Sequence, residues 1–487
     1  MIDFNKLDEY RENNRVEAKK ALGGLPKSIW ETYSAFANTL GGIILLGVVE
    51  HKDKSLHTVD LPDAEKLIRE FWEIVNDPNK TSVNILSGKD VYAMDINGNH
   101  IVVINVPRAD RSYKPVYIDG NPLNTYRRNG EGDYKCTIEE YQAMVRDASV
   151  KTQDMLLLKD MDLTVINMDS LHGYRQRMKH SRPGHVWEQL DDETFLVQIG
   201  AAGLGEDGGK HPTAAGLLMF GNEYDIVREF NDYFLVYQEQ YDAGNRRTDR
   251  IISSSGDWSG NLYDFYFRAY NKLKQDIKTH SEMDGITRVD DAPVLKALRE
   301  ALANCLVNAD YYGRGGVVII RKPKLITMAN PGNMRIELDA AVSVGASDPR
   351  NGTLMKMFNL IDIGEREGSG IPNIFSAWRG EGWASPVYDE QMNPDRTVLT
   401  LPLSAKRIGN KKATTETGDK RSVLSERVKE SIIGYLTDKP EGKTAEIAEY
   451  IGLKPSRTRD YIKGLVDEGI IEAIGSSKKT RVYKLKR

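Results

Sequence analysis

Cysteine is nearly absent from this sequence, with only Cys136 and Cys305 among 487 residues. Two thiols so far apart provide neither a disulfide framework nor a Cys-x-x-Cys zinc pair, which fits a reducing compartment. Histidine is also scarce, with 8 residues and no His-x-x-x-His pair, so zinc chemistry is not expected. Together these absences lead us to expect a cytoplasmic protein.

Long apolar runs are absent as well. No stretch approaches the roughly 18–20 apolar residues that cross a bilayer, and the first residues, MIDFNKLDEYRENN, carry charges in place of a secretory apolar core. We therefore expect no membrane partner. The sequence also has no Gly-x₄-Gly-Lys-Ser/Thr loop and no Gly-x-Ser-x-Gly motif, which argues against a P-loop motor and a serine-nucleophile elbow.

The net charge is small, −4 overall, but it is unevenly distributed. Residues 404–487 contain 20 Lys and Arg against 12 Asp and Glu, whereas the remainder of the chain is acidic. A basic tail on an acidic body predicts that contact with a polyanion is concentrated at the C-terminus. A solvated basic surface is the alternative.

The C-terminal residues have the pattern of a winged helix-turn-helix. Residues 404–422 are polar and nearly free of large apolar groups, as in a linker, and 423–487 give three helical patterns and two strands across a basic turn. Arginine near the start of the third helix would reach base edges, and basic wing residues would meet phosphates. Protein contact or dimerisation is the alternative use. The predicted DNA contacts are Lys454, Ser456, Arg457, Arg459, Lys463, Lys478, Lys479 and Arg481.

Residues 1–150 predict one α/β unit organised around residues 15–51. This stretch gives a short strand, a helix and a continuous apolar strand, IILLGVV. Glu12 and Glu17 lie at its start, and Glu50, with Asp53 nearby, follows the apolar strand. Two or three carboxylates around Mg²⁺ or Mn²⁺ are what metal-assisted phosphodiester hydrolysis requires, so this set predicts a metal and catalytic site. A surface ion pair between Glu17 and Lys19 is the plainer alternative.

Three motifs in this region resemble the Schlafen-type AlbA domain. They are VEAKK, then LPKSIWETYSAFANTLGGIILLGVVE, then KPVYI followed by YRRNG and T-x-EE, over about 140 residues. The resemblance implies a small α/β domain that binds nucleic acid and, in some Schlafen members, cleaves RNA. It favours a phosphate-binding role for Lys19 and for Arg127, Arg128 and Asn129, although an ordinary charged hairpin turn is the alternative. The third carboxylate departs from the family pattern, because the strand ends in Glu50.

Residues 151–403 form a central α/β region. We expect a mostly helical start that ends in a strand near Phe195–Ile199. The order LLMFG, REALANCLVNADYY, NPG and GSGI resembles a RecG-like C-terminal module of the GHKL ATPase type. The resemblance implies ATP binding with Glu300 polarising water, although the Asp-x-Gly-x-Gly floor motif is missing and Asn304 could be a satisfied helix amide. The implied nucleotide-binding residues are Asn304, Asn308, Asn330, Gly332, Gly368 and Gly370.

The expected architecture is therefore α/β and multidomain: an AlbA-type domain at 1–150, a GHKL-like module within 151–403, a linker, and a winged helix at 423–487. Our first hypothesis is a DNA-binding regulator, such as a regulator of transcription, that senses ATP and forms a homo-oligomer, since one winged helix reads one half-site. The second is a metal-dependent ribonuclease, acting in defence against phage.

Overall fold

The computed structural model describes residues 4–240, 249–275, 277, 292–343, 345–364, 369–404 and parts of 432–486. The chain divides into two compact units, Met1–Lys406 and Arg407–Arg487, and each is described by itself. Within the described residues, no helix combines the length and apolar character that crossing a membrane requires.

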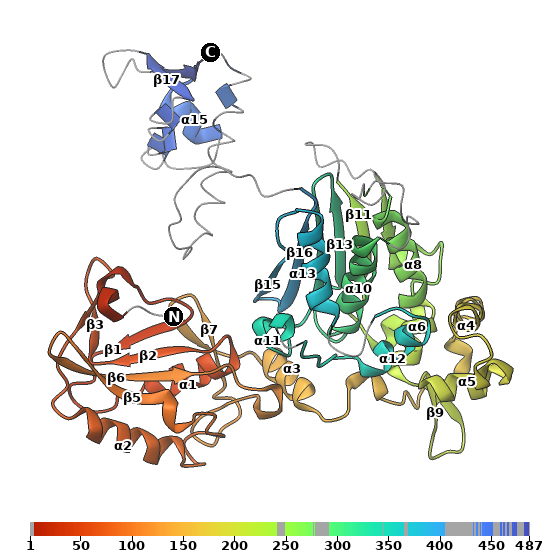
Figure 1. Ribbon diagram of the computed structural model, residues 1–487, viewed down its shortest axis with the longest axis horizontal. Coiled ribbons are helices and arrows are strands. Elements are labelled where there is room, and N and C mark those ends of the chain that lie inside the picture. The colour runs from red at the N-terminus through yellow and green to blue at the C-terminus, as the bar shows by residue number, and fades with distance from the viewer. Residues whose placement is uncertain are drawn as a thin grey trace. The chain divides into compact units, whose positions relative to one another are not determined.

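The first part of the larger unit is built on a four-stranded sheet with the order β1-β2-β6-β5 (Figure 1). Strands β1 and β2 are parallel, and the other pairs are antiparallel. The two smaller pairs, β3 with β4 and β7 with β8, lie outside this sheet. The strands are β1 (Val16–Lys19), β2 (Gly42–Leu46), β3 (Val48–Glu50), β4 (Leu56–Thr58), β5 (Val91–Ile96), β6 (Asn99–Val106), β7 (Tyr126–Asn129) and β8 (Gly132–Lys135).

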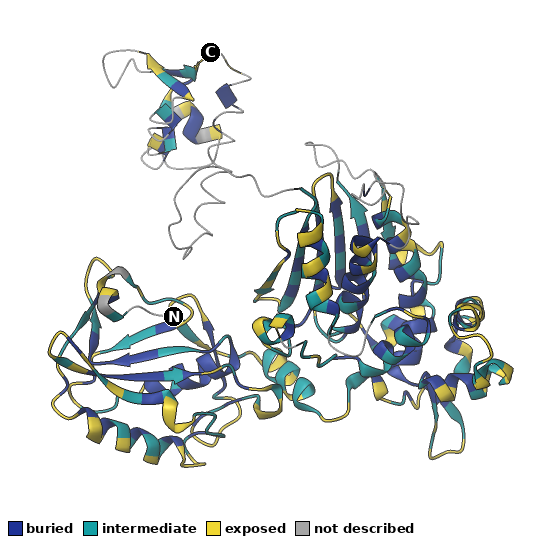
Figure 2. Cartoon of the chain, in the orientation of Figure 1, coloured by how far each residue is buried: buried dark blue, intermediate teal, exposed yellow. Residues whose placement is uncertain are grey.

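This sheet is covered on both faces. Helices α1 (Ile29–Asn38) and α2 (Ala64–Val75) share one core with Ile44 and Ile104, whereas Leu45, Val103 and their neighbours belong to a second core. Alternate residues of a strand point to opposite faces, so both sets are apolar, which explains the continuous apolar sequence. Figure 2 shows the buried positions running along the inner strands.

The expected single strand IILLGVV is wrong in one respect, because it is divided into β2 and β3. Gly47 separates the two strands with a positive φ of 80°. A Cβ at this position would lie 2.8 Å from the side chain of Leu61, so glycine satisfies both the backbone and the space. Helix α3 (Ile138–Ala148) begins at a reciprocal capping box, which Thr137 and Glu140 form.

The next segment is mainly helical. The expected strand near Phe195–Ile199 is wrong: these residues belong to helix α5, where Asp191 accepts a hydrogen bond from the Thr194 amide and caps the helix. Phe195, Leu196 and Ile199 then bury one helical face. The segment contains α4 (Met168–Ser181), α5 (Asp192–Ile199), β9 (Ala202–Leu204), β10 (Lys210–Pro212), α6 (Ala214–Phe220) and α7 (Glu223–Glu229).

A six-stranded sheet with the order β12-β11-β13-β14-β16-β15 forms the rest of the larger unit. Helix α10 packs against α8, α12 and α13 and contacts β14, so it lies between the helical layer and the sheet. The strands are β11 (Leu235–Glu239), β12 (Arg250–Ile252), β13 (Val317–Lys322), β14 (Leu325–Pro331), β15 (Val387–Gln391) and β16 (Arg396–Pro402). The helices are α8 (Leu262–Leu273), α10 (Pro293–Val307), α11 (Leu338–Ser343), α12 (Gly352–Leu360) and α13 (Gly370–Gly380).

The described parts of the smaller unit contain helix α15 (Thr444–Tyr450) and an antiparallel pair, β17 (Ile471–Ile474) with β18 (Val482–Leu485). Its core includes Ile447, Leu465 and Tyr483. Of the predicted DNA contacts, Arg459 is described and exposed. Lys454, Ser456, Arg457, Lys463, Lys478, Lys479 and Arg481 lie outside the described residues.

Candidate functional site

Helix α10 and its C-cap residue align Glu300, the predicted water-polarising residue, with two of the predicted nucleotide-binding residues, Asn304 and Asn308. The Asn304 side-chain amide donates to Glu300 Oε1 at 3.3 Å, and the Asn308 amide donates to the Asn304 carbonyl at 3.0 Å. A spacing of four residues places these side chains one above another. Asn330 of β14 and Gly370 of α13 line the same pocket, so the structure brings together five of the seven predicted positions.

The two remaining predicted positions, Gly332 and Gly368, are not found in this pocket. Gly332 follows β14 and lines the neighbouring cavity instead, and Gly368 lies outside the described residues. The sequence reasoning missed the apolar part of the pocket, which Met328, Tyr388 and Leu399 of the sheet provide. The alternation of apolar residues in β14 and β16 could have indicated this apolar wall.

The pocket is small in this structure. Its volume is about 90 Å³, well below the roughly 300–1,000 Å³ of small-molecule sites. The Glu300 carboxylate lies directly against Gly370 at the start of α13, where a Cβ would overlap Oε1. A helix N-terminus is a place where phosphate binds. The residues therefore suit a nucleotide by chemistry, but Glu300 and its neighbours have to move to admit one.

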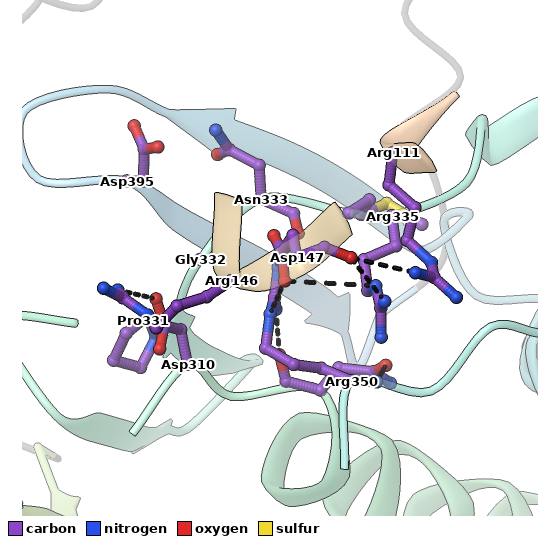
Figure 3. Close-up of polar contacts among 12 residues, drawn as sticks. Arg111, Arg146, Asp147, Asp310, Pro331, Gly332, Asn333, Arg335, Arg350 and Asp395 are labelled. Carbon is purple, nitrogen blue, oxygen red and sulfur yellow. Dashed lines mark hydrogen bonds and ion pairs between the residues drawn. The ribbon is translucent and has the colours of Figure 1, made fainter. Parts of the chain in front are cut away.

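Arg350 closes the other side of the pocket. Its buried guanidinium donates to the carbonyls of Asn308 and Asn333 and makes two bonds of 2.8 Å to Asp147 on α3 (Figure 3). Arg335 donates to the Asp147 carbonyl at 2.9 Å. The pocket wall is thus connected directly to the AlbA-type part of the chain.

Some of the predicted metal-binding carboxylates of the first domain lie close together. Glu12 Oε1 accepts from the Ala18 amide at 2.9 Å, and burial, with the charges of Glu17 and Glu50 added, raises the pKa of Glu12. Glu50 Oε1 is buried and has no hydrogen-bond partner in the described structure. Asp53, the other candidate for the third carboxylate, is exposed and bonds Ser55. Glu50 is therefore the third carboxylate near Glu12.

Glu17 is occupied by cations. It forms 2.8 Å pairs with Lys19 and with Arg128, and Lys19 also donates to Ser28. Within the described residues, no group of three His, Cys, Asp or Glu side chains is arranged to hold a metal ion. Glu50 keeps Oε1 for Mg²⁺ or Mn²⁺, while its Oε2 pairs with Lys54 at 3.0 Å. Glu17 would first have to leave both of its cation partners.

Arg127 and Arg128 lie inside the protein. Arg128 is 1% exposed and bonds Glu17, Asp133 and the Asn13 carbonyl. Arg127 makes bonds of 2.7 and 2.9 Å to Asp395 in the turn before β16. Asn129 alone of the three is exposed, at the hairpin end. The two arginines therefore join parts of the chain, and neither is exposed on the outer surface where it could contact a nucleic-acid backbone.

Comparisons with known proteins give four family matches. Residues 12–137 match "Schlafen, AlbA_2", and residues 317–401 match "Putative ATP-dependent DNA helicase recG C-terminal". Residues 428–480 match "FaeA-like protein", and residues 142–236 match a domain of unknown function. The comparison with curated proteins gives no match.

Two solved structures are similar. The DIP2311 protein from Corynebacterium diphtheriae is 15% identical, with 97% of this chain and 95% of that chain covered and a TM-score of 0.37. The N-terminal domain of a RecG-related protein from Nitrosomonas europaea is 30% identical, with 28% of this chain and 95% of that chain covered and a TM-score of 0.23. From the family matches, the chain is a Schlafen-type AlbA-domain protein that also carries a RecG C-terminal, ATPase-like module.

Proposed function

We propose that the protein is a nucleic-acid-binding regulator, acting mainly on DNA, whose ATPase-like pocket senses ATP. The observation that supports this most is the gathering of Glu300, Asn304, Asn308, Asn330 and Gly370 around one pocket. The same chain carries a Schlafen AlbA-type domain and a basic C-terminal unit. A homo-oligomer would let two C-terminal units contact two half-sites.

Phosphate contacts are assigned to exposed cations. In the AlbA-type domain these are Arg11, Arg15, Lys20 and Lys27 around β1, since Arg127 and Arg128 are internal. In the C-terminal unit the phosphate contacts are assigned from the sequence alone to the basic wing residues Lys478, Lys479 and Arg481, which lie outside the described residues. Cations that neutralise phosphates release counterions, so affinity falls as salt rises.

The test is duplex DNA binding by fluorescence anisotropy across a salt series. We expect the log–log slope to become shallower by about 0.9 for each phosphate that a variant no longer neutralises, hence by about 1.8 in Lys478→Ala with Lys479→Ala. Lys439→Ala, an exposed cation of the same unit, is the matched control. An unchanged slope in the double variant would remove the C-terminal unit from the DNA interface.

ATP sensing has its own test. Titration calorimetry with ATP and Mg²⁺ should give saturable binding in the wild type and none in Asn304→Ala. ATP should then change the DNA affinity of the wild type but not of Asn304→Ala, as measured by fluorescence anisotropy. Equal heats from both proteins would exclude this pocket as the nucleotide site.

A second candidate function is a metal-dependent ribonuclease. It is favoured by one observation, the buried, unbonded Oε1 of Glu50 beside Glu12. Carboxylate oxygens are the ligands that Mg²⁺ and Mn²⁺ prefer, and a bound ion would activate water and stabilise the leaving oxygen. Mn²⁺ binding, followed by electron paramagnetic resonance, should disappear in Glu12→Gln with Glu50→Gln and persist in Asp53→Asn. RNA cleavage should follow the same pattern; Mn²⁺ binding that survives the double variant rejects this site.

A further inference from the structure

A cavity of about 420 Å³ lies in the seam between the AlbA-type domain and the ATPase-like module, both in the larger unit. Its volume falls within the roughly 300–1,000 Å³ of small-molecule sites. It is lined by the loop after β6, helix α3, the loop after β14 and the turn between β15 and β16. It is a different space from the ATPase-like pocket, although the two share Asn333, Met334 and Arg335 as a common wall.

The carboxylates around this seam cavity already have partners. Each is bonded to an arginine, so their acceptor capacity is largely used inside the protein. The pairs are Glu390 with Arg108, Asp395 and Glu140 with Arg127, Asp310 with Arg146, Glu139 with Arg314, and Asp147 with Arg350. Figure 3 shows part of this set, with Asp147 and Arg350 at its centre.

The unused hydrogen-bonding groups of the lining are mostly donors. The Nε atoms of Arg127, Arg146 and Arg335 are shielded from bulk solvent and have no hydrogen-bond partner in the described structure. Asn333 Oδ1 is the corresponding unused acceptor. These Nε atoms have almost no accessible surface, so a ligand would instead meet the terminal nitrogens of the guanidinium groups. The hydrogen bonds of Arg127 all use Nη1 and that of Arg146 uses Nη2, which leaves Arg127 Nη2 and Arg146 Nη1 for an acceptor-rich occupant.

Lys114 adds a further donor. It lines the cavity, and its amine donates to the Asn38 carbonyl at 3.1 Å. Burial, together with the neighbouring charges of Arg108 and Arg127, lowers the pKa of Lys114 to about 7, and Glu390 and Asp147 oppose this shift. A bound anion would stabilise the protonated amine.

We propose that the seam cavity is a second ligand site, which binds a small phosphate-bearing molecule of nucleotide size through Lys114, Arg127 and Arg146. Phosphate oxygens would accept hydrogen bonds from the Lys114 amine, Arg127 Nη2 and Arg146 Nη1. Because the lining comes from both domains, the ligand would stabilise their association. The site goes beyond the proposed regulator function and does not require it.

The test uses the full chain and inorganic pyrophosphate as the probe, followed by titration calorimetry. We expect saturable binding in the wild type and a loss of affinity of at least tenfold in Lys114→Met, which keeps the apolar stem. Lys80→Met, a surface lysine paired with Asp119, is the matched control and should bind like the wild type. The melting temperature of each variant is measured first, to show that it is folded.

Two further readouts separate this site from its alternatives. Asn304→Ala, which alters the ATPase-like pocket, should leave pyrophosphate binding intact; loss of binding there would place the anion in that pocket and overturn the proposal. Sulfate, which does not titrate near neutrality, should bind several-fold more tightly at pH 6 than at pH 8, with this dependence absent in Lys114→Met. The proposal would be rejected if the wild type gave no saturable heat with pyrophosphate, or if Lys114→Met bound pyrophosphate as tightly as the wild type.

Discussion

The pKa of the half-buried carboxylate of Glu12 depends on its surroundings. Burial raises its pKa above the ordinary value, and Glu17 and Glu50 add to the shift. A raised carboxyl pKa means that the ionised form is less favourable in the folded than in the unfolded chain, so folding is penalised at pH values above the raised pKa. The penalty disappears as pH falls through that value.

We therefore predict that Glu12→Gln increases the urea midpoint at pH 7, since the neutral amide keeps the bond from Ala18 and removes the charge. The difference from the wild type should shrink as pH is lowered toward the ordinary carboxyl range. Glu206→Gln, whose side chain is 92% exposed, is the control and should show no such convergence. A lower midpoint for Glu12→Gln at pH 7 would contradict this explanation.

Asp147 has the opposite behaviour. Burial works against its charge, but Arg350 outweighs burial and holds the pKa of Asp147 below the ordinary value. Its contribution is therefore fully present above about pH 4 and is lost as pH falls through the lowered pKa. Removing one partner of a buried pair leaves the other charge uncompensated.

Asp147→Asn should accordingly destabilise the fold by roughly 3 kcal/mol at pH 7, the lower end for a broken buried pair. The loss should be much smaller near pH 3, where the wild type also loses the charge. Urea unfolding at both pH values is the measurement, with exposed Asp160→Asn as the reference variant. Equal destabilisation at pH 7 and pH 3 would show that the charge is not responsible.

At the scale of the element, helix α6 depends on close backbone approach. A Cβ on Gly216 would overlap the carbonyl of Ala201, which belongs to the backbone and cannot rotate away. Overpacking a core typically costs about 1–3 kcal/mol, and a backbone obstacle places Gly216→Ala at the upper end. Gly380→Ala in α13 has open space and should be neutral or stabilise by up to about 1 kcal/mol. Guanidinium unfolding of both variants tests the contrast.

The sequence predicted elements well where the determining contacts are local. The start of α3 at its capping box follows from neighbouring residues. The face of α10 with Glu300, Asn304 and Asn308 follows from helical spacing. The break at Gly47 was missed because Leu61, which fills the space, is distant in sequence. The seam cavity was missed for the same reason, since Arg127 meets Asp395 across 268 positions.

At the scale of the molecule, the AlbA-type domain and the ATPase-like module are joined by buried, charged contacts. Arg108 bonds both oxygens of Glu390, and Arg127 bonds both oxygens of Asp395. We expect the larger unit to melt in one calorimetric transition. In the double variant Glu390→Gln with Asp395→Asn, Arg108 and Arg127 lose their counter-charges. The AlbA-type domain and the ATPase-like module should then melt in two separate transitions. Glu193→Gln with Asp160→Asn, on exposed side chains, is the control; one unchanged transition in the seam variant would contradict the coupling.

The seam also has a consequence for synthesis. Arg108 is translated 282 residues before Glu390, a delay of roughly 14–56 s at typical elongation rates of about 5–20 residues per second. During that interval the AlbA-type domain has its own core but lacks the carboxylates that cover Arg108 and Arg127. The growing chain therefore presents a cationic surface beside the ribosome that the finished protein no longer has.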